Sequence, residues 1–204
     1  MKQVFRLLLL IGLLAACATS PPRQVNNICR VFDQKPSWYK AAAKSKKRWE
    51  SSIPLMMAFM HQESRFVSYA KPPRTKILGF IPGPRKSSAY GYSQAQDSTW
   101  KWYKKSTGHW GADRDNFQDA IDFIGWYNMQ TKKKNGVSLN DAYSLYLAYH
   151  EGHGGFKKKS YHKKPWLKKV AKKVVRQAST YSKQLKTCEQ RYISGGSGFS
   201  LWPF

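Results

Sequence analysis

The chain has 204 residues and a formal net charge of +25, from 36 lysines and arginines against 11 aspartates and glutamates. Its length is ample for one domain with one hydrophobic core. The charge does not indicate the fold. It favours anionic binding partners, and the candidates are nucleic acid, lipid head groups and the cell wall.

Residues 1–16 predict a secretory signal peptide. Lys2 and Arg6 precede an apolar run over residues 7–14, which is too short to span a membrane. The run ends in Leu14-Ala15-Ala16-Cys17, which resembles a bacterial lipobox and so implies cleavage before Cys17 and lipidation of that cysteine. The alternative is an ordinary signal peptide in which Cys17 is incidental.

The residue after Cys17 indicates the location. Ala18 stands there rather than an acidic residue, and by resemblance to lipoproteins of two-membrane bacteria this favours the periplasmic face of the outer membrane. Secretion argues against nucleic acid as a physiological partner, although a purified sample is expected to bind it at low salt.

Residues 17–27 predict a polar tether, and residues 28–192 the structured domain. Cys29 and Cys188 lie at the two ends of that domain, and in an oxidising compartment they are expected to form a disulfide. A bridge closing about 160 residues would contribute on the order of 5 kcal/mol at most. Two free buried thiols are the alternative.

The domain is expected to be mainly α-helical. Its predicted helices cover residues 36–49, a stretch that begins after Ser51 or Ser52, a stretch from Asp97, and residues 116–133, 140–149 and 166–188. Gly136 and Gly152 are the expected stops of the fourth and fifth of these helices.

The second predicted helix carries Glu63. Met56, Phe59 and Met60 precede it at helical spacing, so the four side chains share one face. A carboxylate at the edge of the core is desolvated, which raises its pKa toward the value that a general acid needs near neutral pH. The alternative is a buried structural glutamate paired with a lysine or arginine.

Residues 70–90 stand apart from the helical pattern. They are rich in Pro, Gly, Lys and Arg, and Thr75–Ile81 predicts a small β-hairpin. A long loop of this kind is either a lid or rim over a binding groove or a solvated surface hairpin, and the sequence leaves both open. Residues 193–204 form a Gly/Ser-rich tail that ends in an unexplained apolar cluster.

Three short segments place polar groups in apolar settings: residues 61–66, 89–94 and 147–152. Amides and hydroxyls suit sugar hydroxyls, aromatic faces suit sugar rings, and one carboxyl suits a glycosidic oxygen. These residue types predict a site that grips a neutral sugar polymer.

In this order and spacing the segments resemble the lysozyme-like lytic transglycosylases of the soluble (SLT) type, over roughly residues 50–185. Glu63-Ser64 matches the Glu-Ser motif, and Gly91-Tyr92-Ser93-Gln94 matches Gly-Leu-Met-Gln with Tyr-Ser in place of Leu-Met. Ala148-Tyr149-His150-Glu151-Gly152 matches Ala-Tyr-Asn-x-Gly with His150 in place of Asn. Tyr181 is the best fit to the late tyrosine.

The resemblance implies a single lysozyme-like domain that cleaves peptidoglycan between N-acetylmuramic acid and N-acetylglucosamine and forms a 1,6-anhydro ring. Glu63 would act as acid and then as base, and Tyr181 would hydrogen-bond it, or else be an ordinary core residue. Ser64, Tyr92, Gln94, Tyr149 and His150 are the expected substrate-binding residues, with structural roles as the alternative. No cofactor is implied.

Two rival functions stay open. One is a lysozyme-type hydrolase on the same fold, and the other is a non-catalytic peptidoglycan-binding envelope lipoprotein. Asp97 is expected to cap a helix. Glu151 is expected either to face solvent or to raise the pKa of Glu63 by repulsion.

Two further features concern binding. His150 and His153 are three residues apart with a glycine between them, unlike the His-Glu-x-x-His pattern, so no metal site is predicted. The lysine-rich run 157–173 is expected to contact anionic wall polymers, stem-peptide carboxylates or lipid head groups, with a solvated helix face as the alternative.

Overall fold

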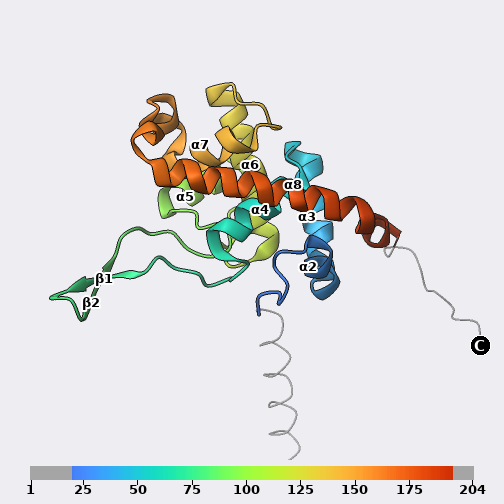
Figure 1. Cartoon of the computed structure of the whole chain (residues 1–204), viewed down its shortest axis with the longest axis horizontal. Coiled ribbons are helices and arrows are strands. Elements are labelled where there is room, and N and C mark those ends of the chain that lie inside the picture. Colours follow the sequence, from blue (N-terminus) through green and yellow to red (C-terminus); the bar gives the residue numbers. More distant parts are fainter. Residues whose placement is uncertain (1–19, 195–204) are drawn as a thin grey trace, which may run out of the picture.

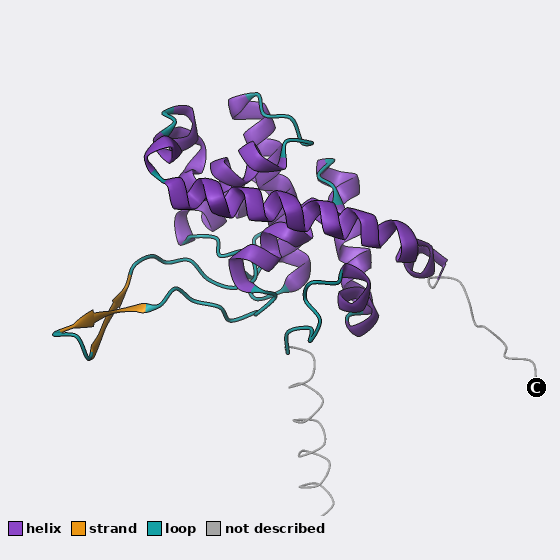
Figure 2. Cartoon of the chain, viewed as in Figure 1, coloured by secondary structure: helices purple, strands orange, loops and turns teal. Residues whose placement is uncertain are grey.

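The computed structural model describes residues 20–194. In chain order the elements are α2 (Ile28–Gln34), α3 (Pro36–Trp49), α4 (Ile53–Ser64), β1 (Arg74–Ile77), β2 (Ile81–Arg85), α5 (Asp97–Thr107), α6 (Phe117–Asn135), α7 (Ala142–Lys157), the short 3₁₀ helix η1 (Ser160–Lys163) and α8 (Pro165–Ser194). The helices cluster together and the hairpin projects from them (Figures 1 and 2). The predicted mainly α class with a small hairpin is confirmed.

Helix ends follow local sequence rules. The side chain of Asn116 accepts hydrogen bonds from the N–H groups of Gln118 and Asp119 at the start of α6, and Gly136 ends that helix at φ 70°. Asparagine caps and left-handed glycines satisfy the backbone groups that a helix end leaves unpaired. In α4 the N-cap is Ser52, and a proline occupies the first turn.

Helix α4 lies at the centre of the core. Met56, Met57, Phe59 and Met60 are fully buried. The helix packs against α8, α6 and α3, and the long α8 crosses the molecule beside it (Figure 1). A helix covered on several sides has only its end left for solvent, and Glu63 lies at that end.

The predicted disulfide is confirmed. Cys29 in α2 is bonded to Cys188 in α8, which joins the two ends of the domain. The core cluster, with the apolar residues packed on it, is drawn from Val25 to Tyr192. Residues 20–194 therefore contain the whole described core and both cysteines of the bridge.

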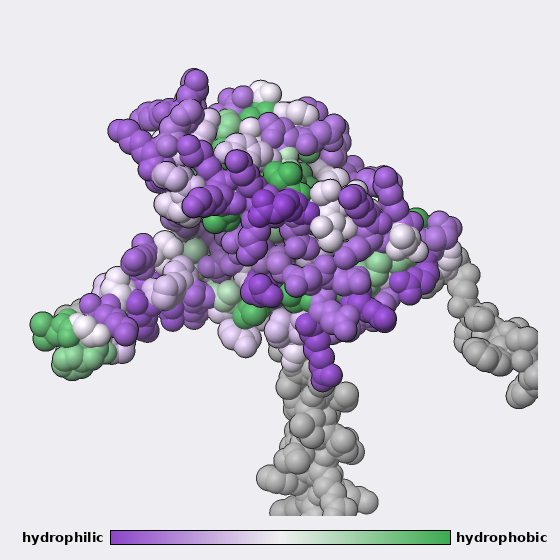
Figure 3. All heavy atoms as spheres, in the orientation of Figure 1, coloured by the Kyte–Doolittle hydropathy of each residue, from purple (hydrophilic) through white to green (hydrophobic). Residues whose placement is uncertain are grey.

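The antiparallel pair β1–β2 forms an arm. Its strands pack chiefly on each other, and its tip lies away from the helices (Figures 1 and 2). The tip carries apolar side chains and the arm is otherwise mostly polar (Figure 3). Ser87 and Ala89, at the base of this arm, line the cleft described below, whereas the tip projects from the helices (Figure 1).

Two local features differ from expectation. Helix α2 and η1 were not predicted, because each is only one or two turns long and carries little periodicity. Gly152 ends the first helical stretch of α7, as predicted, because its φ of 72° and ψ of 159° are not helical; the unpredicted feature is the second helical stretch, which follows this kink and continues to Lys157. Glycine tolerates this backbone conformation, which a side chain would disfavour.

Within residues 20–194 no helix is both long and apolar enough to cross a membrane. The predicted signal peptide, the lipidated Cys17 and the apolar cluster of the tail lie outside the described residues. The predicted domain limits stay predictions.

Candidate active site

Glu63 lies in the last turn of α4 and is partly buried. The helix ends directly after it, with Arg65 and Phe66 both at positive φ, 51° and 63°. The chain changes direction sharply at this turn, and Glu63 at the end of the helix lines a cleft. The apolar stripe that precedes Glu63 removes water from one side of its carboxyl.

The carboxyl of Glu63 has one hydrogen-bond donor from α7. The hydroxyl of Tyr146 donates to Glu63 Oε1 at 2.9 Å. Burial raises the pKa of Glu63 to about 7, and the Tyr146 hydrogen bond opposes that rise. A hydroxyl that donates to the carboxylate favours the charged form, whereas desolvation disfavours it, and here desolvation is the larger effect.

The cleft in front of Glu63 has a volume of about 350 Å³. It is lined by one residue of α4, the segment before and into α5, two aromatic residues of α6, and the middle of α7: Glu63, Ser87, Ala89, Gln94, Ala95, Gln96, Thr99, Phe123, Tyr127, Tyr149, His150, Glu151 and Gly152. Rings, amides and hydroxyls beside a desolvated carboxyl are what a site for a neutral sugar polymer requires.

Comparison with known proteins places this arrangement in a family. A family model described as Transglycosylase SLT domain matches residues 5–188, which is most of the chain. The chain belongs to the transglycosylase SLT domain family. A search of curated proteins gave no match, and neither did a search of solved structures. The family accounts for a mainly α, lysozyme-like domain and supports, at a general level, a lytic transglycosylase type of function on peptidoglycan.

In this SLT domain the second motif forms a tight turn at the cleft. Gly91 has φ 75°, and a Cβ there would lie 2.1 Å from the carbonyl oxygen of Arg114, so only glycine fits. Gln94, at φ 51°, donates from its amide to the carbonyls of Ala70 and Gly91, each at 2.9 Å. Gln94 lines the cleft, and its amide nitrogen holds the turn together. Its predicted role in substrate binding stays a prediction.

The third motif, in α7, also lines the cleft. The Tyr149 hydroxyl donates to the carbonyl of Ser93 at 2.6 Å, and its ring packs edge-on against Phe59 and Tyr127. His150 is exposed beside it and packs edge-on against Trp166. Both residues line the cleft, and Tyr149 also joins the second and third motifs. Their predicted binding of substrate stays a prediction.

Glu151 does not face solvent, which corrects that expectation. Its side chain is only 3% exposed, and its carboxylate lies 2.7 Å from Lys164 Nζ and accepts a hydrogen bond from Ser160. Burial alone would raise the pKa of Glu151, but the hydrogen bonds from Lys164, Ser160 and His150 lower it overall. Glu151 is not among the causes of the raised pKa of Glu63.

Three predicted site residues lie away from the cleft. The ring of Tyr92 is 4% exposed and packs against Trp38 and Phe117, so it belongs to the core. The Ser64 hydroxyl donates to the carbonyl of Met60 in its own helix at 3.2 Å.

The hydroxyl of Tyr181 donates to the carbonyl of Val25, so the predicted hydrogen bond from Tyr181 to Glu63 is wrong. Tyr181 is fully buried on the α8 side of α4, where it packs near His61. Tyr146 takes the predicted role instead. Its spacing of three from Tyr149 puts both rings on one face of α7, which is the signal that sequence reasoning missed.

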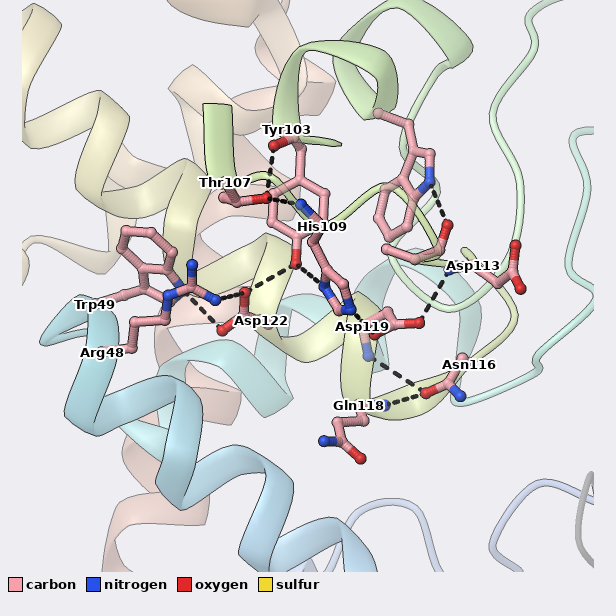
Figure 4. A network of polar contacts seen from close by, with 12 residues as sticks. Arg48, Trp49, Tyr103, Thr107, His109, Asp113, Asn116, Gln118, Asp119 and Asp122 are labelled. Atoms are coloured by element: carbon pink, nitrogen blue, oxygen red, sulfur yellow. Dashed lines mark hydrogen bonds and ion pairs between the residues drawn. The ribbon is translucent and has the colours of Figure 1, made fainter. Parts of the chain in front are cut away.

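The carboxylates of Asp122 and Asp119 in α6 bind side chains and backbone groups outside the cleft (Figure 4). Asp122 of α6 accepts hydrogen bonds from Trp49 and Tyr103, both at 2.8 Å, and lies 3.3 Å from Arg48. Asp119 accepts from the backbone N–H of Asp113 at 3.0 Å and lies 3.7 Å from His109 (Figure 4). This network joins α3, α5 and α6 and takes no part in the cleft.

Asp97 is also structural. It does not cap α5, whose N-cap is Gln96, but begins it and forms an ion pair with Arg114 at 2.7 Å. The predicted cap is therefore wrong by one residue, whereas the predicted helix start is right.

Cavity size does not select the site. A cavity of about 460 Å³ lies between α4 and α8, and its carboxylate, Glu189, accepts a hydrogen bond from Tyr39. That cavity contains no residue of the three motifs. Among residues 20–194 no three His, Cys, Asp or Glu side chains gather as metal ligands would.

Proposed function

We propose that the chain is a lytic transglycosylase that cleaves the β-1,4 bond between N-acetylmuramic acid and N-acetylglucosamine and leaves a 1,6-anhydro end. The observation that carries the proposal is Glu63, a carboxyl with a pKa raised to about 7 that opens onto a cleft of sugar-binding residue types. A carboxyl with this pKa is present in both protonation states near neutral pH, so it suits a group that must give a proton and then take one.

The first step is protonation of the glycosidic oxygen by Glu63, which breaks the bond and releases the N-acetylglucosamine side as an alcohol. The substrate's own acetamido group stabilises the positive charge at the anomeric carbon. Glu63, now a carboxylate, receives the hydrogen bond from Tyr146 that favours its charged form.

In the second step the C6 hydroxyl of the same muramyl residue attacks the anomeric carbon. Glu63 takes the hydroxyl proton, and the C6–O–C1 bond closes the anhydro ring. The enzyme returns to its starting protonation state, and no water is consumed. This scheme belongs to the substrate-assisted exceptions to the two-carboxylate rule.

Glu151, the other carboxylate lining the cleft, supports a one-carboxylate scheme. Its ion pair with Lys164 and its hydrogen bonds keep it ionised, so it has no proton to give. Two cleft carboxylates with oppositely shifted pKa values have separate roles, and only Glu63 is suited to acid chemistry.

The proposal is tested by Glu63→Gln, which conserves shape and removes the titrating group. Release of glycan fragments from purified sacculi is expected to fall about 10³-fold, because one side chain supplies both proton transfers. His61→Gln, two residues earlier and on the other side of α4, is the control and should release fragments at close to the wild-type rate. Unchanged release by Glu63→Gln would contradict the proposal, and sacculus binding without release by the wild type would favour a binding module.

We also propose that Cys17 is lipidated and holds the domain at the periplasmic face of the outer membrane. The lipobox-like sequence supports this, and the exposed lysines of residues 157–173 would add contacts with anionic wall polymers or head groups. Mass measurement of the mature chain from the membrane fraction tests it: a Cys17 N-terminus carrying acyl chains is expected, and an unmodified chain cut after Ala16 or Ala18 would contradict it.

A further inference from the structure

The arm formed by β1 and β2 carries the two most exposed large apolar side chains among those that the structure describes. Leu78 is 79% exposed and Phe80 is 76% exposed, and both lie in the turn at the tip of the arm. Figure 3 shows this apolar tip at the end of a polar arm. An exposed apolar cluster of this kind marks a contact surface.

The conformation of the turn does not explain these residues. Leu78 has φ 53° and Gly79 has φ 81°. Hairpin turns with two consecutive positive φ angles favour asparagine, aspartate and glycine, and leucine is disfavoured there. Leu78 therefore gains neither burial nor a preferred backbone conformation within this chain.

The arm behind the tip is strongly basic. It carries five cations and no acid over residues 71–86, and each cation is exposed: Lys71, Arg74, Lys76, Arg85 and Lys86. An apolar tip behind which cations gather fits an anionic lipid surface, because the apolar groups enter the acyl region while the long cationic side chains reach the head groups.

Strand addition by a second protein is a poorer fit. Pro82 and Pro84 occupy β2, and Pro72 and Pro73 precede β1. Proline lacks the N–H that an added strand needs, so these positions protect the edges of the arm. The sugar polymer is a poorer fit too, because the tip points away from the helices (Figure 1) and only the base of the arm, at Ser87 and Ala89, lines the cleft.

We propose that the β1–β2 arm is a membrane probe whose tip, Leu78 and Phe80, inserts into the head-group region of an anionic phospholipid bilayer. The cations of the arm hold it there, and the base of the arm fixes the position of the cleft relative to the membrane. This contact is separate from the predicted lipid anchor and from catalysis.

The test uses residues 20–194, which contain the whole described core and the disulfide but not the predicted anchor. Flotation is measured with vesicles that contain phosphatidylglycerol and with vesicles of phosphatidylcholine alone. The wild type is expected to float with the anionic vesicles only. Leu78→Ser with Phe80→Ser is expected to weaken that binding at least about tenfold, because two inserted apolar side chains are lost.

The matched control is Trp110→Ser with Ile193→Ser, which removes two exposed apolar side chains outside the arm. It should bind within about twofold of the wild type, since neither residue is placed at the interface. Insertion is measured separately as the rise in surface pressure of a phosphatidylglycerol monolayer, which the tip variant should lose and the control should keep.

Three results would overturn the proposal. They are absence of wild-type binding to anionic vesicles, equal binding by the tip variant, and a tip variant that loses retention on sacculi but not on vesicles. The tip variant should cleave soluble glycan fragments at the wild-type rate. A failure of the membrane-binding proposal would therefore leave the catalytic proposal intact.

Discussion

Desolvation acts on a titratable residue on each side of α4, but only one of the two residues lies at a cleft. Glu63 and His61 lie two residues apart, which on a helix turns their side chains to nearly opposite sides. Desolvation drives both toward the neutral form, raising the pKa of Glu63 to about 7 and lowering that of His61 to about 4. Only Glu63 meets a cleft.

Each side also has a buried tyrosine. On the cleft side Tyr146 donates to Glu63, and on the α8 side Tyr181 donates to the carbonyl of Val25. Burial and a nearby tyrosine are therefore not enough to identify an acid. The open cleft and the target of the hydroxyl decide which side performs chemistry and which side holds the fold.

Removal of the disulfide between α2 and α8 should lower stability without lowering glycan release. Replacing Cys29 and Cys188 by serine is expected to lower the free energy of unfolding by on the order of 5 kcal/mol at most, because the unfolded chain is no longer closed into a loop of about 160 residues and gains conformational entropy. Urea unfolding measures it. Glycan release per folded molecule should not change, and a loss of release in fully folded protein would give the bridge a role in the cleft.

Acid should destabilise the fold through His61. Its folded pKa of about 4 lies below the unfolded value of 6.5, so the unfolded chain binds the proton first as the pH falls. Stability is full above pH 6.5 and is expected to drop, by on the order of 3 kcal/mol from His61, as the pH falls to about 4. His153, also lowered to about 4, adds to the effect.

Thermal unfolding between about pH 7.5 and 4.5 measures this dependence. His61→Gln removes one titrating group and should flatten the pH dependence even if it lowers stability at every pH. An equally steep dependence in His61→Gln would show that the acid sensitivity arises elsewhere.

Glu63 should act in the opposite direction. Its folded pKa is above the unfolded value of 4.5, so its contribution to stability is lost as the pH rises from 4.5 through 7. Glu63→Gln is expected to raise the free energy of unfolding at about pH 8 by on the order of 1–3 kcal/mol. Denaturant unfolding of the wild type and of Glu63→Gln at that pH measures the difference.

Glu151→Gln is the matched control, and it should have the reverse sign. The pKa of Glu151 is lowered, so its ionised form stabilises the folded protein above its unfolded pKa, and that stabilisation is lost with Lys164 left unpaired. If both glutamine variants stabilised the protein at about pH 8, the contrast between the two carboxylates would be lost.

The smallest expected effect comes from comparing Tyr146→Phe with Tyr181→Phe. Tyr146→Phe removes the hydrogen bond to Glu63 and should lower glycan release about tenfold, or ~1.4 kcal/mol. Because that bond lowers the pKa of Glu63, its loss should also move the alkaline fall of the pH profile to higher pH. Tyr181→Phe should leave the pH profile unchanged, and a shift in that variant instead would restore the original prediction.

Features that depend on local sequence were predictable. The periodicity of residues 56–63 placed Glu63 on the apolar stripe of α4, and Gly91 and Gln94 were recognisable as a motif at the cleft. The pairing of Cys29 with Cys188 followed from the predicted oxidising compartment and from their positions at the ends of the predicted domain.

Features that depend on packing between helices were not predictable. Which tyrosine reaches Glu63 is set by how α7 and α8 lie against α4, and the sequence of each helix does not contain that. Tyr92 sits in a turn between two left-handed residues, which directs its ring to Trp38 while Gln94 reaches the cleft. Glu151 meets Lys164 only because the chain kinks at Gly152 and returns through η1.

The most direct test of the central claim is the mass of the muramyl ends released from sacculi by the wild type and by Glu63→Gln. If Glu63 alone gives the proton to the glycosidic oxygen and takes it from the C6 hydroxyl, the wild type produces 1,6-anhydro ends, one water lighter than reducing ends, and Glu63→Gln produces almost none. Reducing ends from the wild type would contradict the account, because they would mean that water and not the C6 hydroxyl completes the reaction.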